Sequence, residues 1–279
     1  MWRPNVWEFS KLQLTHTILS KRRIRKLVTS GTCRGWDDPR LLTVNGMRRR
    51  GFTAEALNAF CTEVGVTRSA NTIPLTRLEQ ALRIDLDPRS PRIFLVTDPL
   101  LVTITNLPAS ASFALPAPLF PKEPEKGEPR TLTLGSKIWI EQSDFRLEDE
   151  KGYFGLAPGK TVGLRYGGNL KCTGVVRGGA GGRVVEITAE YEHERSSKPK
   201  GNIHWLPFDA PRAEARLYNP LFSVPNPGER TGNWEDDVNP HSEVVCQEAR
   251  VEPGREAEFT LYAHFQAERL GFFTVDKDS

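Results

Sequence analysis

The fold of this chain is decided by residues 87–96, which read DPRSPRIFLV. The two prolines prevent a helix from continuing through the segment, because proline lacks a backbone N–H and clashes with the preceding turn. The four residues after Arg92 are apolar and favour an extended strand. We therefore expect helices before this segment and short β-strands after it.

Three helices are predicted before the prolines. Ser20 can cap a helix from Lys21 to about Thr29, and Gly31 would stop it. Apolar residues at a helical spacing predict a second helix that begins at Thr53 and ends at Gly65. A third is expected over residues 74–85, with Pro74 in its first turn.

Short β-rich runs dominate the sequence after Arg92. They cover residues 93–96, 137–141, 161–165, 183–191, 213–218, 244–251 and 259–262, and turn residues separate them as in a barrel or sandwich. Residues 178–182 (GGAGG) predict a hairpin loop, and a phosphate cradle is the lesser alternative because no helix follows. The proline-rich residues 107–130 are interpreted as a connection.

Composition narrows the class of protein. With 279 residues, of which 38% are hydrophobic, the chain can bury a core and is expected to form two or three compact units. It contains no apolar run of the roughly 20 residues that cross a bilayer and no signal-peptide pattern, so we expect no membrane association. Four scattered cysteines, Cys33, Cys61, Cys172 and Cys246, predict neither disulfides nor a structural metal site.

Charge is distributed unevenly along the chain. Residues 1–92 hold 17 Lys and Arg against 8 Asp and Glu, whereas the remainder holds 21 against 27. A basic first third joined to a mildly acidic remainder suggests a polyanionic partner that docks mainly on the first part.

Residues 17–23 (TILSKRR) form the sharpest local motif. They place Ser20 and Lys21 at a helix start, where backbone N–H groups attract an anion and a lysine can follow a phosphate as its charge shifts. A solvated basic helix is the alternative interpretation of the same pattern.

This motif resembles the Lys-Met-Ser-Lys-Ser loop of class I aminoacyl-tRNA synthetases, in the variant found in glutaminyl-tRNA synthetases. Other blocks resemble that family in order and spacing, at residues 3–10 (RPNVWEFS), 35–40 (GWDDPR), 48–52 (RRRGF), 60–61, 65–66, 202–205 (NIHW), 216–222 (RLYNPLF) and 268–273 (ERLGFF). The resemblance extends over nearly the whole chain.

The resemblance implies a role for the motif in glutamine activation. In the family, glutamine reacts with ATP, used with Mg²⁺, to give glutaminyl-adenylate and pyrophosphate. The glutaminyl group is then transferred to the 2′-hydroxyl of the terminal adenosine of tRNA(Gln), and AMP is released. Lys21 would be the catalytic residue, and Leu19, Ser20 and Lys21 would bind ATP. The partner His-x-Gly-His type motif does not occur in this sequence, so we expect the chain to bind tRNA without charging it.

The resemblance also implies anticodon-binding residues in the β-rich part. Arg92, Gln266 and Arg269 match positions that contact the central anticodon base, and Arg165 matches a position near the first base. A surface group without a ligand is the alternative for each. Residues 153–156 (YFGL) lack two cations that many relatives carry near the third base, so the sequence leaves open how that base is read.

Contacts with the tRNA stem are expected from a weaker signal. Arg48, Arg49 and Arg50 are the candidates in the arginine block, and Thr67 and Arg68 follow the second predicted helix. Ion pairs with Asp37 and Asp38 are an equally good explanation of the arginines.

The fold implied by the resemblance is an α+β multidomain one, a small helical stem-contact subdomain followed by two anticodon-binding β-barrels (ribosomal protein L25-like). Residues 1–91 would hold the end of the catalytic region with the signature loop and the helical subdomain. Residues 92–120 and 207–279 would form the proximal barrel, with the distal barrel at residues 121–206. The resemblance also implies a further strand beyond residue 279.

Two alternatives remain. A glutamyl-tRNA synthetase of eukaryotic or archaeal type shares the loop and the barrels, but the blocks at residues 48–50, 60–61 and 268–273 look glutaminyl. A stand-alone tRNA- or protein-binding module would suit the Met1 start, but it would not need Lys21. We expect a cytoplasmic monomer with tRNA(Gln) as partner and with glutamine and ATP as substrates of the parent enzyme, and a multi-synthetase complex stays open.

Overall fold

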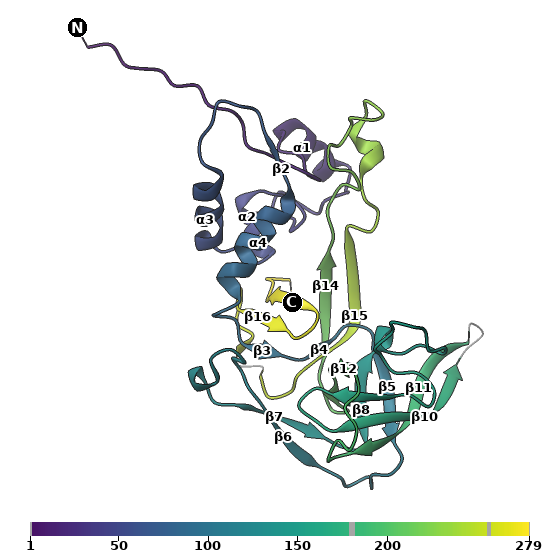
Figure 1. Cartoon of the computed structure of the whole chain (residues 1–279). Coiled ribbons are helices and arrows are strands. Elements are labelled where there is room, and N and C mark those ends of the chain that lie inside the picture. The colour runs from purple at the N-terminus through teal and green to yellow at the C-terminus, as the bar shows by residue number, and fades with distance from the viewer. Residues whose placement is uncertain (1, 179–181, 256–257, 279) are drawn as a thin grey trace.

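The computed structural model describes residues 2–178, 182–255 and 258–278, which form a mostly β structure with few helices. The helices gather at one end of an elongated molecule and most of the strands at the other (Figure 1). A long hairpin of β14 (Arg212–Tyr218) and β15 (Glu243–Val251) runs from the β-rich end towards the helices.

All three predicted helices are confirmed. They are α1 (Lys21–Thr29), α3 (Ala54–Val64) and α4 (Leu75–Leu86). Thr53 caps α3 by accepting a hydrogen bond from the Ala56 N–H, whereas the Ser20 side chain makes no such bond to α1. Pro74 precedes α4 as its N-cap residue and is not part of its first turn. A short helix that the sequence did not predict, α2, spans Val44–Arg49.

Two small cores hold the helical end together. Phe52, Phe60 and Leu78 are buried against the parallel strand pair β1 (Gln13–Leu14) and β2 (Thr72–Ile73). In the second core, Ile24 and Leu27 of α1 pack with Leu221 and Phe222 from the far end of the β14–β15 hairpin. The hairpin therefore contributes apolar side chains to the helical end.

The largest sheet has seven strands and curls into a half-barrel around the main core. In spatial order it comprises β12 (Asn202–Ile203), β9 (Thr161–Leu164), β10 (Asn169–Gly178), β11 (Arg183–Glu192), β5 (Pro99–Ile104), β8 (Lys137–Glu141) and β13 (Leu206–Pro207). Trp205 and Ile140 are fully buried inside it. Strand β5 is the first of these strands in the sequence, and it follows directly after β3 and β4 of the smaller sheets.

Three smaller sheets complete the β-rich part. Strand β4 (Leu95–Val96) extends the β14–β15 hairpin, and β3 (Arg92–Ile93) pairs with β16 (His264–Ala267), which pairs with β17 (Gly271–Thr274). The last sheet comprises β6 (Phe113–Ala117) and β7 (Arg130–Leu134). Short 3₁₀ turns lie at Pro124–Lys126, Gln142–Asp144 and Trp234–Asp237.

Most of the predicted strands are present, with two corrections. Residues 259–262 form no strand, and the strand begins two residues later at His264. Phe259 instead packs edge-on against Phe265, at 5.4 Å between ring centroids. Residues 107–130 are more than a connection, because they contain β6, whose Pro116 is tolerated in a two-stranded sheet.

Strands β10 and β11 pair antiparallel up to Gly178 and Arg183, and residues 179–181 of the predicted loop lie outside the described residues.

Strand β5 lies within the range predicted for the proximal barrel but pairs with β8 and β11 of the distal range. The division into two barrels at the predicted boundaries stays a prediction.

Candidate functional site

The signature motif lies at the start of α1. Ile18 is buried in the core beneath it, and the Ser20 carbonyl accepts the first helical hydrogen bond, from the Ile24 N–H at 2.9 Å. Leu19 and Ser20 are half-buried, and Lys21 is exposed at the first position of the helix. Among the described residues, the Lys21 ammonium has no ion-pair or hydrogen-bond partner. Its charge is therefore available to a ligand.

Arg92 and Gln266 are neighbours, because they are register partners in the β3–β16 pair. The Arg92 side chain is buried and donates hydrogen bonds to Asp87 Oδ1 at 2.7 Å and to the Ser90 carbonyl at 2.8 Å. Arg92 thus ties the end of α4 to β3. Gln266 is half-buried on the neighbouring strand.

Arg269 follows β16 and is held by Asp144. Its two terminal nitrogens donate to Asp144 Oδ2 at 2.6 Å and Oδ1 at 2.7 Å, and this pairing raises the pKa of Arg269. Nη1 also lies 2.9 Å from Nδ1 of His204, whose Nε2 lies 2.8 Å from the Leu95 carbonyl. Because Nε2–H donates to that carbonyl, Nδ1 carries the lone pair that accepts from Arg269.

Arg165 is held by the residue next to Arg269. Its Nε donates to the buried carboxylate of Glu268, which also accepts a bond from the Tyr166 hydroxyl at 3.0 Å. Burial alone would lower the pKa of Arg165, but the Glu268 carboxylate and the Tyr166 hydroxyl together outweigh it and raise the pKa. The Arg165 side chain remains 39% exposed, so part of the guanidinium can contact a ligand.

The structure therefore brings the four predicted anticodon residues to neighbouring positions around β16. Asp144 and Glu268 hold two of them, and neither role was predicted from the sequence, although Glu268 lies in the block at residues 268–273. Asp144 lies 125 residues from Arg269 in the chain, and no local pattern signals such a pairing. Gly155 adjoins this cluster, since a Cβ there would lie 2.6 Å from the Asp144 carbonyl oxygen and 2.2 Å from the Tyr153 hydroxyl.

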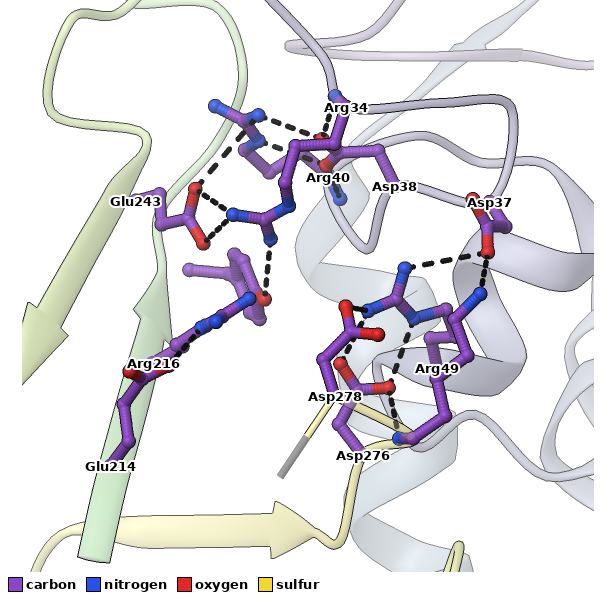
Figure 2. Close-up of polar contacts among 12 residues, drawn as sticks. Arg34, Asp37, Asp38, Arg40, Arg49, Glu214, Arg216, Glu243, Asp276 and Asp278 are labelled. Carbon is purple, nitrogen blue, oxygen red and sulfur yellow. Dashed lines mark hydrogen bonds and ion pairs between the residues drawn. The ribbon is translucent and has the colours of Figure 1, made fainter.

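The three adjacent arginines of the 48–50 block have different environments. Arg49 is buried and pairs with Asp276 and Asp278, both at 2.5 Å, and with Asp37 at 3.4 Å (Figure 2). The ion-pair interpretation thus describes Arg49. Arg50 is half-buried and lies 3.4 Å from Glu79.

Arg48 is the exposed member of this block. Its guanidinium lies over the Tyr262 ring at 4.4 Å, and it makes no ion pair among the residues that the structure describes. Thr67 is half-buried. Arg68 is exposed, and its guanidinium lies over the Trp7 ring at 5.2 Å. Arg48 and Arg68 keep their charge free for a polyanion.

A second group of ion pairs attaches the hairpin to the helical end. Arg34 donates to both carboxylate oxygens of Glu243 on β15, at 2.8 and 2.9 Å (Figure 2). Arg40 donates to the fully buried Asp38 and, at 3.1 Å, to the Ser242 hydroxyl. Burial alone would raise the pKa of Asp38, but the hydrogen bonds from Arg40 lower it below its ordinary value.

We also searched the described residues for a metal site, a reactive cysteine and a membrane-spanning helix. The described residues contain no group of three His, Cys, Asp or Glu side chains that could hold a metal ion. Burial, reinforced by the charge of Asp38, raises the pKa of Cys33 to about 11, which makes it a poor nucleophile. Within the described ranges, no helix has the length and apolar character needed to span a bilayer.

Comparison with known families gives three matches that follow one another along the chain. Residues 1–88 match the catalytic domain of the class I (E and Q) tRNA synthetases, and residues 90–192 and 202–276 match two models of the anticodon-binding domain of the same class.

Individual relatives agree with these matches. The chain is 43% identical to the cytoplasmic glutamine–tRNA ligase of Arabidopsis thaliana, an alignment that covers all of this chain and 36% of the relative. It is 44% identical to the glutamine–tRNA ligase of Cupriavidus metallidurans over 98% of this chain and 48% of that protein. The chain thus spans less than half the length of these relatives. It belongs to the class I (E and Q) tRNA synthetases and corresponds to the C-terminal, anticodon-binding portion of the glutamine–tRNA ligases.

Proposed function

We propose that this chain binds tRNA(Gln) and reads its anticodon through Arg165, Gln266 and Arg269, with Arg92 as the neighbouring contact. The observation that carries the proposal is the convergence of these side chains, which are far apart in sequence, on β16 and the turn that follows it. Anticodon bases are read when they are unstacked and meet arginine and amide groups that recognise their edges. The exposed edge of Arg165 and the half-buried Gln266 are suited to that role.

The free cations at the helical end support a second contact with the same tRNA. Arg48 and Arg68 have no ion-pair partner among the described residues. Nucleic-acid affinity depends largely on such groups, because each neutralised phosphate releases condensed counterions. We propose that Arg48 and Arg68 contact the tRNA backbone, and that Thr67 assists them.

In the longer ligase we propose that Lys21 acts on ATP. An exposed ammonium at the first position of α1 can neutralise charge that develops on the phosphates when the glutamine carboxylate attacks the α-phosphorus and pyrophosphate leaves. Leu19 and Ser20 would shape the loop. Mg²⁺ would enter with the nucleotide, and we assign no ligand for it among the described residues. In that ligase, Lys21→Ala should lower ATP–pyrophosphate exchange by a factor of order 100, with little change in tRNA affinity.

The binding function is tested by titrating the chain with tRNA(Gln), with an anticodon-swapped tRNA(Gln) and with tRNA(Glu), each at two salt concentrations. We expect tighter binding of tRNA(Gln) and weaker binding of all three at higher salt. Preference for tRNA(Glu) would instead support the glutamyl alternative. Equal, salt-sensitive binding of all three would contradict anticodon reading.

A further inference from the structure

Glu268 is a buried carboxylate in the middle of the anticodon-binding cluster. Only 3% of its side chain is exposed, yet it is shared by Arg130, Arg165 and the Tyr166 hydroxyl. A buried carboxylate is stabilised only when such partners satisfy its oxygens. The position of Glu268 is therefore fixed by the groups around it.

On its inner side, Glu268 is anchored by Arg130. The Arg130 guanidinium is 1% exposed and also pairs with Glu252, whose carboxylate accepts a further bond from the Phe94 N–H at 2.9 Å. The same guanidinium lies 4.7 Å from the Phe94 ring and 5.7 Å from the Tyr166 ring. Arg130 cannot move without breaking both ion pairs, so it holds Glu268 in place.

On its outer side, Glu268 restrains Arg165. The Nε edge of Arg165 faces the buried carboxylate and its Nη2 lies 3.5 Å from the Tyr166 hydroxyl, while 39% of the side chain is exposed. One edge of the guanidinium is thus engaged by the protein, and the remaining N–H groups are open to a ligand. A free arginine would lose more side-chain entropy on binding than one that is already oriented.

We propose that Glu268 is a positioning residue that orients Arg165 for the first anticodon base. This proposal rests on the proposed function, because it gives Arg165 its role. Without Glu268, Arg165 keeps its charge but can turn towards any nearby phosphate. Discrimination at the first base should therefore fall more than overall affinity does.

The test is Glu268→Gln in the full 279-residue chain, with Kd measured for tRNA(Gln) and for versions changed at the first, central or third anticodon base. We expect first-base discrimination to fall about 5-fold or more, the range of a lost base contact, and central-base discrimination to be retained. Arg165→Ala should cause the same loss, and the double variant should lose no more than either single one.

Glu252→Gln is the matched control. Glu252 is equally buried and binds the same Arg130, but it does not contact Arg165. Thermal unfolding should show similar destabilisation of both variants, whereas only Glu268→Gln should lose first-base discrimination. If both variants lose it equally, Glu268 is merely structural and the proposal is wrong.

Arg165→Lys keeps the proposal testable if Glu268→Gln does not fold. Lysine keeps the charge but cannot hold Glu268 with one edge and a base with another, so first-base discrimination should fall as in Arg165→Ala. Retained discrimination would overturn the proposal while leaving anticodon reading intact. An unmodified chain without any anticodon preference would overturn both.

Discussion

At the scale of single residues, Arg269 is held in an unusual backbone conformation. Its φ of 72° lies in the left-handed region, which costs a non-glycine residue about 1 kcal/mol or more. The two hydrogen bonds to Asp144 and the contact with His204 offset that cost and fix the direction of the guanidinium. The side chain is thereby set before any tRNA arrives.

We predict that Arg269→Ala lowers discrimination at the central anticodon base by about 1–3 kcal/mol, the usual value of a specific base contact. Titrations with central-base variants of tRNA(Gln) measure this loss. Arg212→Ala, which removes an exposed arginine at the start of β14, is the control and should change nothing. Equal weakening for every anticodon would make Arg269 a backbone contact.

The sequence could predict which residues are candidates but not how each one is held. Lys21 and its helix start follow from a contiguous motif, and the structure places Lys21 as expected. The sequence could not show that Arg49 is buried in ion pairs while Arg48 is exposed, because Asp276, which pairs with Arg49, lies 227 residues away in the chain. The sequence placed Glu268 in a family-like block but did not predict that its side chain is buried. That burial is stabilised by the ion pair with Arg130, which lies on a different strand.

At the scale of elements, local signals decided what could be predicted. Caps and apolar spacing identified α1, α3 and α4, whereas α2 has six residues and contains Gly46, too short a segment for any period to show. Glycine is required at position 46, because a Cβ there would lie 2.5 Å from the Asp38 carbonyl oxygen. Strand partners were beyond prediction, since the parallel pairing of β5 with β11 joins residues more than 80 positions apart.

Thr53 gives a prediction for a single element. Its hydroxyl accepts from the Ala56 N–H at 3.1 Å and donates to Asp85 of α4 at 2.5 Å, so it caps α3 and links two helices. Thr53→Ala should lower the free energy of unfolding by about 1–2 kcal/mol. Urea denaturation measures the loss.

Thr62→Ala is the control in the same helix, because Thr62 is exposed and bonds only the Asn58 carbonyl. It should leave stability unchanged or slightly raised, since alanine is the better helix former. Equal effects of the two substitutions would mean that the cap contributes nothing.

At the scale of the whole molecule, ion pairs join the helical end to the hairpin and to the last described residues. Arg34 and Arg40 reach Glu243 and Ser242 of the hairpin, and Arg49 reaches Asp276. Arg49 is 5% exposed, whereas Asp276 and Asp278 are 20% and 42% exposed. Solvent therefore screens part of this attraction.

Arg49→Ala should lower the free energy of unfolding by about 2 kcal/mol, less than a fully buried pair would lose because the carboxylates are partly hydrated. Arg48→Ala is the adjacent control and should have an effect below about 0.5 kcal/mol, as expected for an exposed residue without an ion pair. Chemical denaturation compares them. Similar losses would show that the arginine block acts through its total charge alone.

The same contacts predict a pH dependence. Burial alone would raise the pKa of Asp276, but the hydrogen bond and charge of Arg49, together with the hydrogen bond from the Lys277 N–H, outweigh it and place the pKa below the ordinary value of 3.8. A carboxyl group with a lowered pKa contributes stability above its unfolded pKa and loses it as pH falls through the folded pKa. The urea concentration at the unfolding midpoint should therefore decrease as the pH is lowered below about 4. The decrease should be less steep in Arg49→Ala than in the unmodified chain. Parallel pH profiles of the two proteins would refute this.

The β14–β15 hairpin is anchored at both ends, by β4 at its base and by Leu221 and Phe222 against α1 at its tip. Each added pair of residues per strand would lengthen it by about 7 Å, and a single added residue would turn its side chains to the opposite face. Either change would remove Leu221 and Phe222 from their contacts with α1 or displace Glu243 from Arg34. The two strands therefore have a fixed length between their anchors, and insertions are tolerable only in the loop that follows Phe222.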